Sequence, residues 1–97
     1  MTTKCYDGTS LETFDSVTGA KFDRMIDSIY VYDVGTTESE AKACIDIYRA
    51  YLKTQGYNNI SEYDFYDIYK ISNGYLRLIP GTDGGHYACS VDFPDEP

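Results

Sequence analysis

The side chains able to do chemistry in this sequence are mainly carboxylates and tyrosines. Its 97 residues contain 16 Asp and Glu, 11 Tyr, 3 Cys and a single His, with no Trp. Carboxylate pairs serve in acid–base catalysis, but among so many acids no particular pair stands out. Nucleophilic catalysis by Ser or Cys needs a neighbouring base, and nothing near His86 indicates such a pair. We therefore expect a protein that is not an enzyme.

Metal and phosphate chemistry also lack a matching pattern. His86 and Cys89 stand three residues apart, but a structural zinc site needs four ligands, so Cys5 and Cys44 would have to converge on them. The glycine-rich stretch around Asp83 contains no lysine and places a carboxylate where phosphate would approach, so a tight turn is the better interpretation. The sequence predicts neither a bound metal nor a cofactor.

Aromatic and acidic side chains are most concentrated between residues 62 and 69. Tyrosine is enriched at protein interfaces, and 11 tyrosines exceed what a core of this size readily needs. The alternative is a half-buried helix or strand whose aromatic face belongs to the core. Acids spaced along a helix or strand lie about 5–7 Å apart, and such a row imitates the charge of a phosphate backbone. The candidate partner-binding residues are Glu62, Tyr63, Asp64, Tyr66 and Asp67, together with Asp83 and Asp92.

The acidity of the chain is uneven. The formal net charge is −8, and residues 54–97 hold seven acids against only Lys70 and Arg77. An acidic protein repels nucleic acid and anionic lipid, so basic protein surfaces become its natural partners. We expect no direct binding to nucleic acid or to membranes. Acidity that serves only solubility is the alternative interpretation.

The N-terminal residues and the cysteines bear on the cellular compartment. The first ten residues include no apolar stretch typical of a signal peptide, and no apolar run approaches the ~20 residues that span a bilayer. Three cysteines form an odd number without CxxC spacing, which argues against a disulfide framework. We expect a cytoplasmic protein with reduced cysteines.

The length and the hydrophobic pattern predict one globular domain over residues 1–97. Its expected class is α+β, with two or three helices packed on a small antiparallel sheet of about three strands. Thr36 or Thr37 is a good N-cap for the clearest helix, which ends near Gly56. Apolar residues at helical spacing predict a further helix over 20–28. Alternating or β-branched runs predict strands over 29–34, 75–79 and 87–93, with a turn over 80–85.

The segment 60–72 is ambiguous between helix and strand. Its aromatic and Ile content favours a strand. Ser61 followed by Asp64 resembles a capping box, and the charged residues Asp64, Asp67 and Lys70 recur every three residues, which favours a helix. We favour the helix. The alternative is a hairpin that turns at Asn73-Gly74, a strong hairpin signal.

In size and charge, the chain resembles the small acidic inhibitors that phages encode against host defence, including DNA-mimic anti-restriction and anti-CRISPR proteins. The resemblance rests on composition and assigns a role to no residue. It implies a protein that binds and inhibits a basic, nucleic-acid-binding protein such as a nuclease. The alternative is a small structural or oligomerising domain that is acidic only for solubility.

Overall fold

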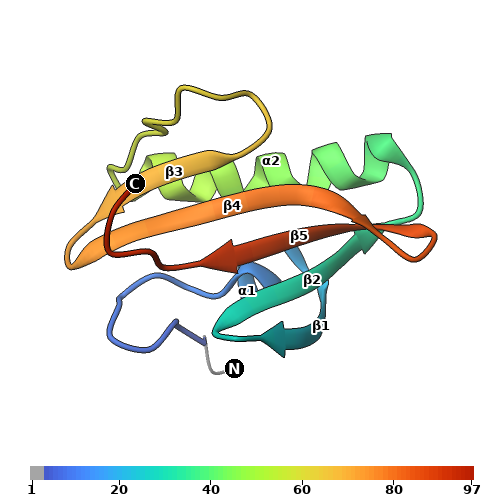
Figure 1. The fold of residues 1–97 in the computed structure, drawn as a ribbon, viewed down its shortest axis with the longest axis horizontal. Coiled ribbons are helices and arrows are strands. Elements are labelled where there is room, and N and C mark those ends of the chain that lie inside the picture. The colour runs from blue at the N-terminus through green and yellow to red at the C-terminus, as the bar shows by residue number, and fades with distance from the viewer. Residues whose placement is uncertain (1–3) are drawn as a thin grey trace.

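The computed structural model describes residues 4–97, which form a five-stranded antiparallel sheet and two helices (Figure 1). The strands lie in the order β1-β2-β5-β4-β3 across the sheet. The α+β class is therefore confirmed, but the sheet has five strands and not about three. The elements are α1 (Phe14–Thr18), β1 (Lys21–Ile26), β2 (Ile29–Gly35), α2 (Glu38–Thr54), β3 (Asp67–Ile71), β4 (Gly74–Asp83) and β5 (His86–Asp92).

The helix α2 begins and ends where its sequence predicts. The Thr37 side chain accepts a hydrogen bond from the backbone N–H of Glu40, which confirms the N-cap. After the last turn, Gly56 has a φ of 90°, a left-handed conformation that glycine adopts without a Cβ penalty. Within residues 4–97, no helix is both long and apolar enough to cross a lipid bilayer.

The hydrophobic core lies between α2 and one face of the sheet, and α1 packs beside α2 on that same side (Figure 1). Alternate strand residues point toward this face, as the two-residue period of a strand requires. The buried stripe of α2 consists of Ala41, Ile45, Tyr48 and Leu52. The sheet contributes Tyr32, Val34, Leu76, Leu78, Cys89 and Val91, among other residues.

Several tyrosines belong to this core, which accounts for part of the high tyrosine content. The hydroxyl oxygens of Tyr6 and Tyr32 lie 2.6 Å apart, and the Phe14 backbone N–H donates to the Tyr6 hydroxyl at 3.0 Å. The Tyr48 hydroxyl donates to the Glu12 carbonyl at 2.8 Å. Burial raises the pKa of Tyr6, Tyr32 and Tyr48 above the ordinary tyrosine value. These bonds tie the segment before α1 to the sheet and to α2.

The prediction of a helix over 20–28 is wrong, because this segment forms β1 and its turn into β2. Phe22 and Met25 have the three-residue spacing of a helix face. The register of β1 against β2 shifts between Phe22 and Arg24, where the strand bulges. As a result Phe22 lies opposite Tyr32 and Met25 opposite Tyr30, so both point to the same side of the sheet. The bulge therefore puts two apolar residues three positions apart on one side of the strand, a spacing that is also typical of a helix.

The favoured helix over 60–72 is also wrong, and the alternative hairpin is confirmed, although its two turn residues are Ser72 and Asn73, because Gly74 already pairs with Ile71. Residues 67–71 form β3, which pairs antiparallel with β4 directly after this turn. The Ser61 hydroxyl does accept a hydrogen bond from a backbone N–H, but the donor is Tyr63, two residues later. Ser61 thus closes a local turn and caps no helix.

Candidate functional site

Asp67, one of the predicted partner-binding acids, lies inside the domain. It is only 5% exposed, so the expectation that it contributes to an acidic surface is wrong. Its carboxylate accepts from Arg49 Nε of α2 at 2.8 Å and from the Tyr69 hydroxyl at 2.7 Å. The cause is the strand register, because Asp67 and Tyr69 alternate with Ile68 and point toward α2.

Two further predicted acids, Asp83 and Asp92, also form ion pairs within the domain. Asp83 is the last residue of β4. This strand continues beyond the expected range of 75–79, because only Gly84 and Gly85 of the predicted turn over 80–85 lie outside the strands. Its carboxylate is 2.8 Å from the Arg24 guanidinium of β1. Asp92 of β5 accepts from Arg77 Nε of β4 at 3.0 Å, across the two paired strands. Both charges are thus offset locally, which reduces the negative field expected from the second half of the chain.

The structure brings the other four predicted residues, Glu62, Tyr63, Asp64 and Tyr66, together with Phe65 in one loop between α2 and β3. We call residues 60–66 the acidic–aromatic loop. Tyr63 is 55% exposed and Phe65 is 66% exposed. Phe65 was not among the predicted site residues, although its position within the densest aromatic patch is a signal that identifies it.

Three rings of this loop contact one another outside the core. The Tyr63 and Tyr66 rings are stacked, with their centroids 5.7 Å apart and their planes 26° from parallel. The Phe65 ring lies 5.3 Å from that of Tyr63 and 4.9 Å from that of Tyr66, measured between centroids. Ring pairs at these separations stabilise each other, so the loop can hold a large apolar surface toward solvent.

Hydrogen bonds to the edge strand β3 hold the base of the loop. The Asn59 side-chain oxygen accepts from the backbone N–H groups of Ser61 and Ile68, each at 3.0 Å. The Ile60 N–H donates to the Ile68 carbonyl at 2.7 Å. This pairing also covers the outer edge of β3. The first residues of the loop are therefore fixed against the strand, and the edge of the sheet is blocked.

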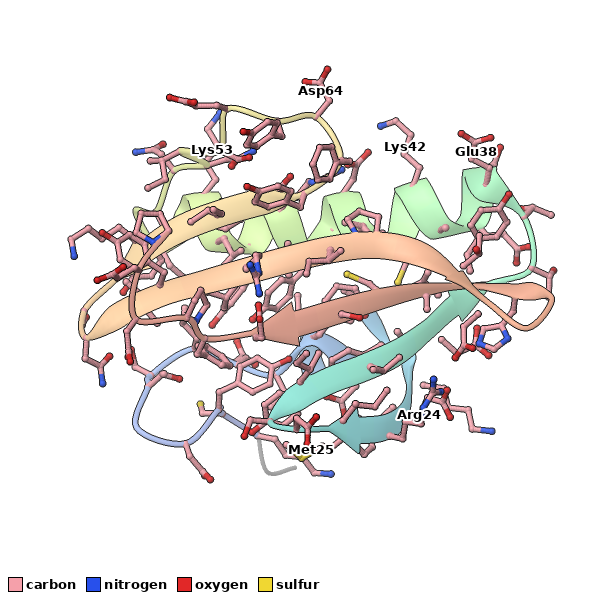
Figure 2. All side chains as sticks on the ribbon, in the orientation of Figure 1. Arg24, Met25, Glu38, Lys42, Lys53 and Asp64 are labelled. Carbon is pink, nitrogen blue, oxygen red and sulfur yellow. The ribbon has the colours of Figure 1, made fainter. Side chains whose placement is uncertain are left out.

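Negative charge gathers around these rings. Neither Glu62 nor Asp64 takes part in an ion pair with any residue in the described part of the chain. Asp64 lies at the apex of the loop with its carboxylate directed away from the body of the domain (Figure 2). Pro97 lines the same cavity as Glu62 and Tyr63, so this residue lies beside the loop.

One group of potential metal ligands occurs among residues 4–97, and it differs from the zinc set considered from the sequence. Ligand atoms of Asp23, Asp83 and His86 lie within 4.8 Å of one another, and the group contains no cysteine. Nε2 of His86 is buried without a hydrogen-bond partner. The Arg24 guanidinium forms ion pairs with both carboxylates. An arginine side chain thus already supplies the positive charge that these two acids attract.

A cavity of about 510 Å³ separates α2 from the β4–β5 hairpin. Its lining includes Ala41, Ile45 and Tyr87 but no His, Cys or Ser. Lys42, which also lines it, forms an ion pair with Asp46 at 2.6 Å. The lining therefore combines apolar contacts with the charged side chains of Glu38, Lys42 and Arg49 on α2.

The chain matches no family of known proteins, no curated protein sequence and no solved structure. The geometry of the acidic–aromatic loop is therefore the basis for a functional proposal.

Proposed function

We propose that this protein is a non-enzymatic acidic binding protein that inhibits a basic protein by occupying its nucleic-acid-binding surface. One observation carries the proposal: the acidic–aromatic loop holds three contacting rings outside the core, beside two carboxylates that have no ion pair among the described residues. Aromatic anchors surrounded by charge are typical of protein–protein interfaces.

The net charge of −8 favours a partner rich in lysine and arginine, such as a nuclease. A phage inhibitor directed against host restriction or CRISPR enzymes, acting in the cytoplasm, is the specific form we propose. The proposed mode of contact differs from the regular row of carboxylates that the sequence suggested. Because Glu62 and Asp64 lie on a loop and Asp67 is buried, the rings anchor the complex while the two carboxylates compete with phosphate for partner cations.

The test is capture of a partner followed by kinetics with charge variants. The immobilised full chain should retain a nucleic-acid-binding protein from the source cells and lower that protein's affinity for its nucleic acid. The double variant Glu62→Lys and Asp64→Lys should slow association about tenfold or more at low salt, and less at high salt.

The matched control changes the same amount of charge elsewhere, with Asp7→Lys and Glu38→Lys. Both acids are exposed and lie outside the loop. The control should associate at close to the wild-type rate apart from a small effect of net charge. Equal slowing in both double variants, or no slowing in the folded loop variant, would remove the loop from the interface.

A second candidate, an oligomerising domain, is favoured by the free edge strand β1. All six residues of β1 are exposed, including Phe22 at 43%, Met25 at 50% and Ile26 at 45%. An apolar strand edge is a template for pairing with a second copy, although the bulge and the charges of Lys21 and Arg24 oppose it. Sedimentation velocity decides this candidate: a concentration-dependent dimer that Met25→Lys converts to monomer supports it, and a wild-type monomer at about 100 μM contradicts it.

A further inference from the structure

A cavity of about 290 Å³ lies beside the acidic–aromatic loop. Its lining residues come from the loop, from β3 and from Pro97, at the end of the chain that Figure 1 marks C. Glu62 is the only charged side chain in its lining. The lining consists of Ile60, Glu62, Tyr63, Tyr66, Ile68 and Pro97.

We propose that this cavity binds the side chain of an arginine that the partner presents, an inference that rests on the proposed function. A guanidinium is planar and weakly hydrated, and it stacks on aromatic faces such as those of Tyr63 and Tyr66. Its forked N–H groups match the two oxygens of a carboxylate, here that of Glu62. The methylene stem of arginine takes the apolar contacts that Ile60 and Ile68 offer.

The cations nearest in sequence to the cavity do not fill it. Arg77 is engaged with Asp92 on the neighbouring strand. The Lys70 ammonium lies 4.9 Å from the centre of the Tyr75 ring. Neither of these two residues lines the cavity. No lysine or arginine among the described residues lines the cavity, so a cation that pairs with Glu62 inside it would come from another molecule.

Other ligand chemistries fit this cavity less well. A phosphate would meet the Glu62 carboxylate with like charge. An apolar side chain would remove water from that carboxylate without supplying a donor. A lysine ammonium is a compact and strongly hydrated charge, so it gains less from stacked rings than a guanidinium does. Arginine satisfies the ring faces, the carboxylate and the apolar walls together.

The test is an amide NMR titration of the isotope-labelled full chain with N-acetyl-arginine amide, compared with N-acetyl-lysine amide and with sodium chloride at matched ionic strength. The arginine probe should bind saturably in the millimolar range and shift amides of residues 60–68. Its affinity should exceed that of the lysine probe by about threefold or more. Equal affinity for the two probes, or shifts scattered over the whole chain, would overturn the proposal.

Two variants of one loop separate the cavity from general charge attraction. Glu62→Gln should weaken arginine binding about fivefold or more, because it removes the carboxylate that lines the cavity. Asp64→Asn removes the same charge from an exposed residue outside the lining, so it should weaken binding less than about twofold. Equal losses in the two variants would mean attraction to charge alone and would reject the arginine site.

The outcomes also separate this inference from the proposed function. Loss of partner binding in the double lysine variant, combined with no arginine site, would leave the inhibitor proposal standing and reject only the cavity. A saturable arginine site in a chain whose loop variants bind the partner normally would instead reject the loop as the inhibitory surface.

Discussion

Arg49 of α2 and Asp67 of β3 form a two-point ion pair that joins the helix to the strand beneath the acidic–aromatic loop. Arg49 Nε lies 2.8 Å from Asp67 Oδ2, and Arg49 Nη2 lies 3.2 Å from Asp67 Oδ1. The Tyr69 hydroxyl completes the set of donors to Asp67. The hydrogen bond from Arg49 to Asp67 is the largest cause that raises the pKa of Arg49. A buried carboxylate of this kind stabilises the fold only while its partners remain, so the pair holds the base of the loop in place.

Asp67→Asn should lower the free energy of unfolding by about 2–3 kcal/mol, because it leaves part of the Arg49 charge uncompensated beside the core. The measurement is urea denaturation followed by circular dichroism. Asp64→Asn, which is exposed, should change the stability by less than about 0.5 kcal/mol. Equal effects of the two substitutions would show that the ion pair contributes nothing specific.

Tyr6→Phe should lower the free energy of unfolding by about 1–2 kcal/mol. The substitution removes the hydroxyl that contacts Tyr32 and accepts from the Phe14 backbone N–H, so two buried polar groups lose a partner. Tyr63→Phe is the matched control, because Tyr63 is 55% exposed. The result to look for is a lower urea midpoint for the Tyr6 variant alone, and a Tyr6 variant as stable as the wild type would contradict the prediction.

The stability of the fold should decline in alkaline solution. Burial raises the pKa of Cys89 from 9.0 to about 12, and it raises those of Tyr6, Tyr32, Tyr48 and Tyr69 above 10.0. Because the folded state holds these protons more tightly, their contribution is complete below about pH 9 and is lost as the pH rises further. Urea midpoints measured from about pH 7 to about pH 11 test the sign. A midpoint that rises with pH above about pH 9 would refute it.

The three cysteines should differ in reactivity. Cys5 is exposed, Cys44 is half-buried, and Cys89 is fully buried on β5 with a raised thiol pKa. Since the thiolate is the reactive form, a thiol reagent at neutral pH should modify Cys5 first and Cys89 last. Mass spectrometry of quenched samples gives the order, and denatured protein should react at all three. Early modification of Cys89 in the native protein would disprove the burial.

The protein should bind neither DNA nor RNA. Half of its eight cations, namely Arg24, Lys42, Arg49 and Arg77, form ion pairs with acids among the described residues, so little basic surface remains for phosphate. An electrophoretic shift assay at low salt should show duplex DNA and single-stranded RNA migrating freely at micromolar protein. Retarded migration of either would contradict both this prediction and the competition mode proposed for inhibition.

Local sequence was sufficient to determine α2, three of the strands and the overall acidity. The ends of α2 depend on Thr37 and Gly56, and a capping hydroxyl or a left-handed glycine acts within one turn of the chain. The strands over 29–34, 75–79 and 87–93 have apolar patterns that need no distant partner to be recognised.

Only the tertiary structure decided the remaining elements and the site. Phe22 and Met25 share one side of β1 because of a bulge against β2, and a bulge is a property of two paired strands. Asp67 is buried because β3 pairs with β4 and directs it toward Arg49, which lies 18 residues earlier in the chain. The sequence pattern was therefore enough to identify the acids and aromatic rings of residues 62–66. Which carboxylates reach solvent depends on strand register, which is a non-local property.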